Sequence, residues 1–520
     1  MNVPLRPSSE PPAAPDHNTG KTPLRIALLI LTATLLAGCA VGPDYRAALL
    51  PTPSHWSAAA GTQPSGPPDL SRWWTRLRDP LLNELIDEAV AGNLDVATAT
   101  AKIREARASY RQAVGALFPT LQNSDSVMRS KGVSARGPAS VPTGGGLSPA
   151  TASSFDTPRT VFQAGFDASW ELDLFGANQR AVEAASYGAD AAEENLRATL
   201  VTLIGDVASN YVQARGFQAR IALARRTASS QDEITQLTKN RFAAGSASAV
   251  DVANATGQAA STRAAIPTLE TAYGEAVHRL SVLTGRPPAA LNARLARIMP
   301  IPAPKLPVPT GIPADILLTR PDVRQAERQY AQSTAKIGQA EAARYPSVSL
   351  TGNIATAGTR LGDLGRNSSI SWSFGPTLSV PVFNAGKLEA AVDIAEAQRD
   401  QFFVAYRASV LAALKDVEDT LLSLDGERAR VRTLATSATA YRQATNLSRS
   451  LYKAGSSSFL EVLTTERSLY SADDALIQSR VLIATGYIAL NKALGGGWDG
   501  YIDASTPQIV DTNVGPHLVR

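Results

Sequence analysis

The sequence lacks most of the residues and motifs on which enzymes depend. Only one of its 520 residues is cysteine, so no disulfide can form within the chain. There is no HExxH motif, no CxxC motif and no glycine-rich phosphate loop. The four histidines are widely separated, at His17, His55, His278 and His517. We therefore expect no enzyme activity, no metal and no organic cofactor.

Long hydrophobic runs and clusters of like charge are also scarce. The mean hydropathy is −0.08, which excludes a protein built from many transmembrane helices. The formal net charge is +4, and no run of lysine or arginine forms the basic patch that is typical of nucleic-acid-binding proteins. We expect no nucleic-acid partner.

The one long apolar stretch lies near the N-terminus, at residues 26–38, after Lys21 and Arg25. It is too short to span a bilayer comfortably and is typical of a signal peptide. It ends in Leu-Ala-Gly-Cys, which matches a bacterial lipobox with Cys39 as the acylated residue. We expect an N-acyl and an S-diacylglycerol lipid on Cys39, and Ala40 favours sorting to the outer membrane. The alternative is an ordinary secretion signal with an incidental cysteine.

Two stretches that lie 210 residues apart share one pattern. Each has an aromatic residue three positions before a glycine and a carboxylate six positions after it. They are Phe242, Gly245 and Asp251, and then Tyr452, Gly455 and Glu461. A glycine that caps the end of one helix, followed by polar residues that begin the next helix, predicts a tight turn between the two. The recurrence predicts a duplicated unit.

Long helices are expected before each turn, at about 176–240 and 385–453. Apolar or small residues recur about every 3.5 positions from 182 to 224, which favours left-handed helix pairing. About 65 residues at ~1.5 Å each give a helix of ~100 Å. Shorter helices are expected at about 80–116 with a break near 93–96, at 247–284, after Arg320 and at 458–494, and the short helices are expected to stack end to end in pairs.

Four segments alternate between apolar and polar residues, which predicts strands with one apolar face. They are 120–129, where the alternation is weak, 162–174, 347–356 and 370–382, and exposed loops are expected at 130–159 and 357–369. Four strands cannot close a barrel, and open edges are forbidden in lipid, so the chain must oligomerise. Two copies would give eight strands and three would give twelve with a lumen; the residues leave both possible.

These features divide the chain into six parts. They are the signal peptide at 1–38, an extended segment at 39–79, a first repeat at 80–285, a proline-rich connector at 286–319, a second repeat at 320–494 and a tail at 495–520.

The start of the mature chain resembles a known family. Cys39-Ala40-Val41-Gly42-Pro43-Asp44-Tyr45 looks like the first residues of TolC-like outer-membrane factors, in particular the NodT and OprM type of efflux lipoprotein. The stretches 320–327, 381–386 and 490–498 are similar as well. The resemblance covers the mature chain. It implies a mixed α and β membrane protein with four transmembrane β-strands per chain and a long periplasmic α-helical barrel, closed as a homotrimer.

The resemblance also implies the function and the partners. The protein would be the outer-membrane exit duct of a tripartite efflux pump, lipid-anchored in the bacterial outer membrane. A periplasmic adaptor would couple it to an inner-membrane RND-type pump. The alternatives are the outer-membrane component of type I protein secretion and a structural, peptidoglycan-associated lipoprotein.

The two turns are the candidate gate. Carboxylates that converge at a closed mouth would form a ring that attracts cations, and Asp251 and Glu461 are the candidates. Both are also helix N-terminal carboxylates that the helix dipole favours, and the two roles are compatible. In the family, Tyr452 matches a latch tyrosine and Leu460 a constriction leucine. Thr464 and Ser457 depart from the family's second aspartate and latch arginine.

The turns are also candidate docking sites. Small residues leave the backbone open to the hairpin tips of an adaptor; the docking residues are Gly245, Ser246, Gly455 and Ser456.

Overall fold

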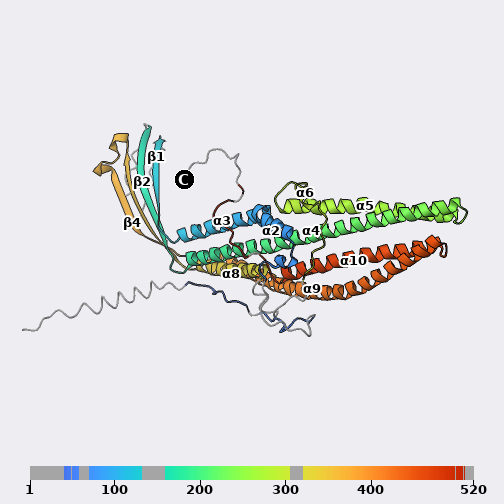
Figure 1. The fold of residues 1–520 in the computed structure, drawn as a ribbon. Coiled ribbons are helices and arrows are strands. Elements are labelled where there is room, and N and C mark those ends of the chain that lie inside the picture. The colour runs from blue at the N-terminus through green and yellow to red at the C-terminus, as the bar shows by residue number, and fades with distance from the viewer. Residues whose placement is uncertain are drawn as a thin grey trace, which may run out of the picture. The chain divides into compact units, whose positions relative to one another are not determined.

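The computed structural model describes residues 40–48, 50–57, 70–131, 158–304, 320–497, 499–507 and 509 (Figure 1). The expected signal peptide and Cys39, most of the loop expected at 130–159, part of the connector and the end of the tail lie outside the described residues. The chain divides into two compact units. The first comprises 1–43, 113–182 and 335–395, and the second comprises 44–112, 183–334 and 396–520.

The first unit contains an antiparallel four-stranded sheet in the order β1-β2-β3-β4. The strands are β1 (Thr120–Ser130), β2 (Arg159–Leu172), β3 (Ser347–Gly358) and β4 (Ile370–Ser379). The four expected strands are confirmed. The prediction that the last one continues to residue 382 was wrong, because Ser379 lies opposite Ser347, the first residue of β3, so the residues after Ser379 have no partner in that strand. Short 3₁₀ turns, η3 (Leu361–Asp363) and η4 (Asn367–Ser369), connect β3 to β4.

The register places apolar side chains together on one face of this sheet. Phe166 lies opposite Ile354, which lies opposite Trp372, and residues that face each other across strands share a face. On β1, however, Asn123 lies opposite Phe166 and Asp125 opposite Ala164. Two polar residues therefore occupy apolar-face positions of β1, which is why its alternation is weak in the sequence.

The helices repeat in length as well as in order. They are η2 (Trp73–Leu77), α2 (Pro80–Gly92), α3 (Leu94–Gly115), α4 (Ala177–Ala243), α5 (Ala249–Leu283), α6 (Asn292–Leu295), α8 (Pro321–Ala342), α9 (Lys387–Ala454) and α10 (Phe459–Ala493). The long helices α4 and α9 have 67 and 68 residues. Helices α3 and α8 each have 22, and α5 and α10 each have 35. In the described part of the chain, no helix has both the length and the hydropathy to cross a membrane.

The short helices stack end to end, as expected, and a side chain joins each pair. Asn93 accepts hydrogen bonds from Asp95 N and Val96 N at the start of α3, while its Nδ2 donates to Leu283 O at the end of α5. At the corresponding place in the second repeat, Arg320 Nη1 donates to Ala493 O at the end of α10. Arg320 also pairs with Asp322 at the start of α8. Each junction therefore satisfies backbone groups that a helix end would leave open.

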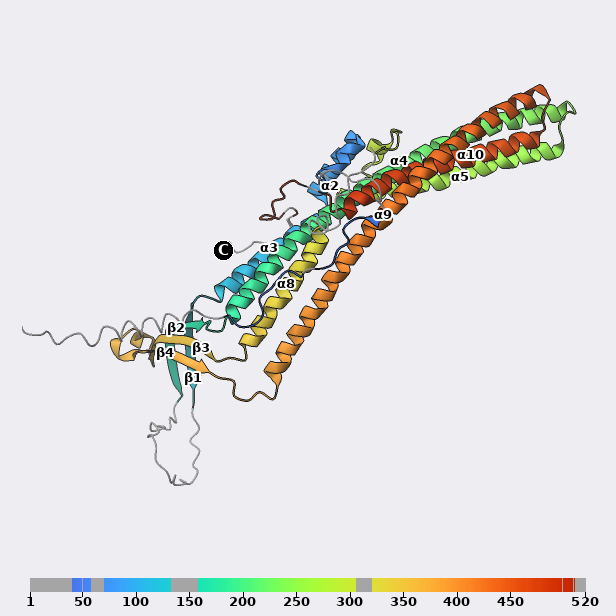
Figure 2. The same cartoon turned by 90° about the horizontal axis from the view of Figure 1, so that it is seen from below.

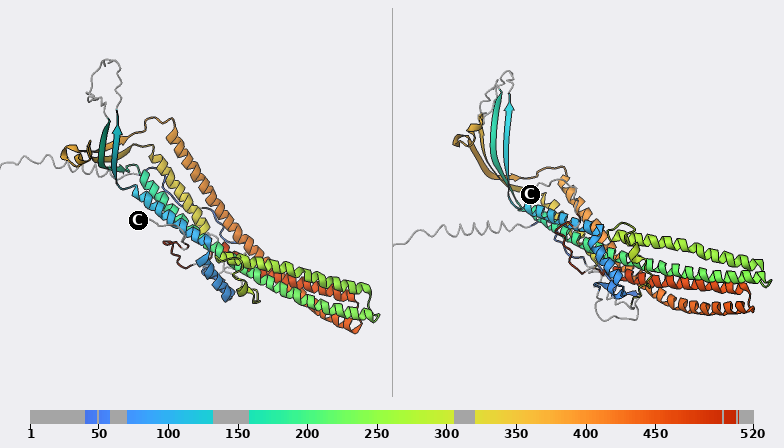
Figure 3. Two further views of the ribbon diagram at one scale, coloured as in Figure 1. Left: turned by 90° about the horizontal axis from the view of Figure 1, so that it is seen from above. Right: turned by 45° about the horizontal axis from the view of Figure 1, so that its top comes forward.

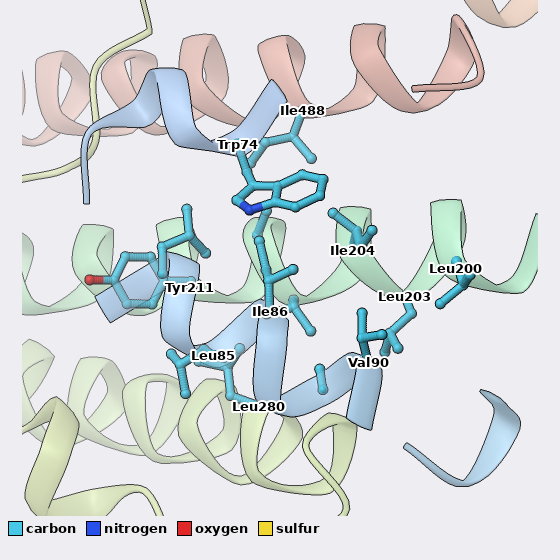
Figure 4. Packing of buried hydrophobic residues seen from close by; sticks show 14 of the residues in the cluster. Trp74, Leu85, Ile86, Val90, Leu200, Leu203, Ile204, Tyr211, Leu280 and Ile488 are labelled. Carbon is cyan, nitrogen blue, oxygen red and sulfur yellow. The ribbon is translucent and has the colours of Figure 1, made fainter. Parts of the chain in front are cut away.

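The core of the second unit lies where η2, α2, α4, α5 and α10 meet (Figure 4). Trp73 and Trp74 are fully buried there, and Tyr487 of α10 packs edge-on against Trp73. The helix α2 begins as the sequence predicts, because Asp79 accepts hydrogen bonds from Leu81 N and Leu82 N and Pro80 occupies the first position.

A buried arginine organises the polar side of this core. Arg215 is 1% exposed. It donates to Arg297 O and to Gln218 Oε1, and lies over the ring of Tyr211. The hydroxyl of Tyr211 donates in turn to Asp79 Oδ2. This network fixes the connector residues 295–297 to α4.

The segment that follows Cys39 lies along the helices, as expected. Tyr45 donates to Glu327 Oε1 and lies edge-on to Tyr187 and Tyr330. Further along, Trp56 is buried in a cluster with residues of α9 and α10.

We predict that Arg215→Ala destabilises the fold. It leaves the buried acceptor Gln218 Oε1 without its donor, which costs about 2 kcal/mol. At about 2 cal/mol/K of unfolding entropy per residue, the thermal unfolding midpoint of the purified protein should fall by about 2 °C. Arg226→Ala, an exposed arginine on the same helix, is the control and should leave the midpoint unchanged. Equal midpoints for both variants would contradict a structural role for Arg215.

Candidate functional site

The first turn joins α4 to α5 through a glycine in the left-handed conformation. Gly245 has φ +72°, Gly245 N donates to Phe242 O, and Ser246 N donates to Arg241 O. This pattern is a Schellman motif, in which glycine has no Cβ to strain. A side chain at Gly245 would meet no atom within 4 Å, so the turn is open on its outer side.

The second turn repeats this geometry between α9 and α10. Gly455 has φ +84°, Gly455 N donates to Tyr452 O, and Ser456 N donates to Leu451 O. The duplicated turn inferred from the sequence is therefore a duplicated backbone structure. Figures 2 and 3 show the α4–α5 and α9–α10 hairpins side by side.

The two helix restarts differ in their capping. Ser248 and Asp251 form a reciprocal capping box, in which Asp251 N donates to Ser248 Oγ and Ser248 N donates to Asp251 Oδ2. At the second restart Ser458 makes no side-chain cap. Glu461 instead accepts a hydrogen bond of 2.6 Å from Ser457 Oγ. Both carboxylates thus lie at helix N-termini, and Ser457 positions Glu461.

Tyr452 connects the two hairpins. It is 3% exposed, its hydroxyl lies 3.0 Å from Thr238 Oγ1 of α4, and Phe459 packs edge-on against its ring. The guanidinium of Arg241 lies over the ring, 4.5 Å from its centroid, in a geometry that favours a cation–π interaction. Tyr452 therefore holds the second hairpin to the first within one chain.

The sequence pattern did not find Arg241 and Thr238. It paired Phe242 with Tyr452, but Phe242 is 49% exposed. A basic residue adjoining the aromatic position of the first turn was the available signal for Arg241. Thr238 gives no signal of its own, because only the packing of α4 against α9 brings it to Tyr452.

An exposed apolar residue follows each turn at the same place. Leu460 and Val250 are the second residues of α10 and α5 and are both about two-thirds exposed. Thr464 is exposed one turn after Leu460 and donates to Leu460 O. Leu460, Glu461 and Thr464 thus lie together on the first two turns of α10.

Behind the second turn, the contact between α9 and α10 is polar and buried. Arg449 Nε donates to Glu466 Oε1 at 2.8 Å, and Ser448 Oγ lies 2.8 Å from Thr465 Oγ1. Burial raises the pKa of the Glu466 carboxyl, and Arg449 offsets this in part. Because a buried polar network needs all its partners, it fixes the register of the two helices.

Comparisons with known proteins agree with this arrangement. Residues 85–286 and 312–496 match the family model described as outer membrane efflux protein. The chain is 34% identical over 468 residues to nodulation protein T of Rhizobium leguminosarum bv. trifolii, covering 89% of this chain and 96% of that one. It is 32% identical to the pyoverdine export outer membrane protein OpmQ of Pseudomonas aeruginosa, and the match covers 90% of this chain and 96% of OpmQ. The structure of the outer-membrane channel OprN superposes on this one with a TM-score of 0.80 at 32% sequence identity. The superposition covers 88% of this chain and 100% of the OprN chain.

We predict that the two caps respond differently to one substitution. Ser248→Ala removes the capping box and costs about 1 kcal/mol, so amide exchange at the start of α5 should rise about fivefold. Ser458→Ala is the matched control, because that serine makes no side-chain cap. Hydrogen–deuterium exchange of peptides covering each turn measures the amide exchange rate in both variants. An equal rise at the two sites would show that the capping box adds nothing.

The buried carboxyl of Glu466 predicts a pH effect. Its folded-state pKa is raised, so folding stability falls as pH rises through that pKa. Glu466→Gln removes this titration, so the stability of the variant relative to the parent protein should improve as the pH rises from about 4, the ordinary carboxyl value, through the raised pKa of Glu466. Glu233→Gln, on an exposed residue of α4, is the control. If the folding stability of the parent protein and of Glu466→Gln changed with pH in parallel, the predicted effect would be refuted.

Proposed function

This chain belongs to the outer membrane efflux protein family, and we propose that it is the outer-membrane exit duct of a tripartite efflux pump, gated at the tips of the α4–α5 and α9–α10 hairpins. The observation that carries the duct is the four-stranded sheet. It has one apolar face and no partner for β1 or β4 at its two edges among the described residues. Such edges are not stable in lipid unless further copies complete the sheet.

The helices carry a matching seam for a second copy. Exposed apolar residues follow one line along α9 at steps close to whole helical turns; they are Val404, Leu411, Leu422, Leu447 and Leu451. Exposed small residues form a line on α5; they are Ala253, Gly257, Ala260 and Ala264. Large side chains from α9 of one copy fit against the small residues of α5 in the next, and the duct closes as a homotrimer with twelve strands.

The gate forms where the tips of three copies converge. In the closed state Tyr452, Thr238 and Arg241 hold the α9–α10 hairpin against α4–α5. Leu460 then supplies an apolar constriction, and Asp251 and Glu461 supply a ring of carboxylates that attracts cations. Opening requires the α9–α10 hairpin to move away from α4, which breaks the contacts of Tyr452.

The turns themselves bind the partner. Gly245, Ser246, Gly455 and Ser456 lie on exposed turns with small side chains, so their backbone groups are accessible to the tips of a periplasmic adaptor. The adaptor connects the duct to an inner-membrane RND-type pump, which selects the cargo. Lipids on Cys39 anchor the N-terminal segment in the outer membrane.

Conductance in planar lipid bilayers tests the duct and its gate together. The parent protein should give small, mostly closed openings. Combining Tyr452→Phe with Arg241→Gln removes both the hydroxyl contact and the cation over the ring, so the open probability should rise several-fold. Tyr441→Phe with Lys239→Gln is the control pair on the same two helices. Absence of current from every preparation would refute the duct; an unchanged open probability in the first pair would refute the latch alone.

Replacing the glycines of both turns with a bulky residue tests whether the adaptor docks there. Gly245→Trp with Gly455→Trp should abolish co-purification with the adaptor and the drug resistance that the pump confers. The two alanine substitutions are the control, because they impose the same positive-φ strain without the bulk. Normal resistance in the tryptophan variant, with normal trimer levels, would refute docking at the turns.

A further inference from the structure

A polar groove runs between α3, α4 and α8, outside the gate. It consists of two adjoining hollows of about 410 Å³ each, which share Lys102 and Asn195 in their linings. Both hollows are lined by residues of the second unit.

The groove has a small-residue floor and hydrogen-bonding walls. Alanines and one glycine of α4 form the floor; they are Ala185, Gly188, Ala191 and Ala192. Amide side chains one turn apart form the α8 wall; they are Gln325, Gln329 and Gln332. The side chain of Gln332 lies on Gly188, and its Nε2 would be 2.8 Å from a Cβ at that glycine. The depth of the groove therefore depends on the missing side chain at residue 188.

The wall on α3 carries uncompensated charge. Lys102, Glu105 and Asp95 line the groove, and their side chains make no hydrogen bond or ion pair within the described part of the chain. Asp206 also lines it and pairs with Lys492. Carboxylates thus outnumber the one lining lysine, and the groove favours a positively charged occupant.

The opposite face of the same helix layer is covered by other parts of the chain. Glu327, about 200° round α8 from Gln325, accepts the hydrogen bond of Tyr45 in the N-terminal segment. Arg104, about 200° round α3 from Lys102, donates to Thr506 O in the C-terminal tail. In the duct described above, segments that lead to a lipid anchor lie on the outside of the wall. The groove then lies on the inside.

We propose that this groove is a binding site in the duct lumen for organic cations that have an apolar body and hydrogen-bonding groups. Glu105 pairs with the cation, the three glutamines bind its polar groups, and the alanine floor contacts its apolar part. Asp95, about 15 Å along α3, adds negative charge from the adjoining hollow. The proposal rests on the duct function, since that function places this face in the lumen. A homotrimer carries three such grooves, so cargo is held along the wall after it has passed the gate.

Binding of ethidium, a planar organic cation, tests the site. Its fluorescence anisotropy should rise on titration with the detergent-solubilised trimer. Glu105→Gln combined with Asp95→Asn should weaken binding at least fivefold, and Gly188→Leu should do the same by filling the floor. Asp190→Asn is the matched control, because this exposed carboxylate lies about 200° round α4 from Gly188. The anion fluorescein should not bind.

Each result decides the proposal. No ethidium binding by the parent trimer, or equal affinity in the groove variants and Asp190→Asn, overturns the site. Bilayer conductance of the same preparations separates this failure from failure of the duct: conducting trimers that do not bind ethidium leave the duct function intact. Isosteric amide substitutions keep the fold, and Gly188→Leu gives an independent reading from the opposite side of the groove.

Discussion

The structure depends on two places where a short helix ends against the start of another. An ordinary helix end leaves backbone groups open, and here one side chain serves both ends of the junction. Asn93 does so with its amide. The guanidinium of Arg320 binds the carbonyl of Ala493 and pairs with Asp322, which itself accepts from Val323 N at the start of α8. Because the junctions hold, two helices of 22 and 35 residues pair with one long helix in each repeat. The hairpin tips and their exposed turns follow from this matching of lengths.

Much of this arrangement is readable from the sequence because it is local. A glycine C-cap, a polar restart and sustained apolar spacing fix the turns and the helices to within a few residues. The polar residues Asn123 and Asp125 on β1 obscure the first strand, since alternation is the only signal that a short strand offers. The last strand ends early because its partner β3 begins at Ser347, which the pattern of β4 alone does not show. The residues proposed for the gate, the docking turns and the lipid anchor remain predictions.

The side-chain contacts between the two hairpins could not be predicted from the sequence. The repeat treats Phe242 and Tyr452 as equivalent, yet only Tyr452 is buried, because the chain packs one side of each hairpin against the other. Thr238 and Arg241 reach Tyr452 across more than 200 residues. The two repeats thus share a backbone and differ in side-chain roles. That difference also appears in the caps, where Ser248 binds Asp251 while Ser457 binds Glu461.

The open edges of the sheet have a consequence for biogenesis. Among the described residues of a single copy, β1 and β4 each lack a partner strand on one side, and the apolar face of the sheet is largely exposed. Membrane insertion of one chain alone would place the unpaired backbone groups of these edges in lipid, at a cost of several kcal/mol for each group. Insertion and subunit association are therefore one coupled step. Its rate depends steeply on the local concentration of newly exported chains.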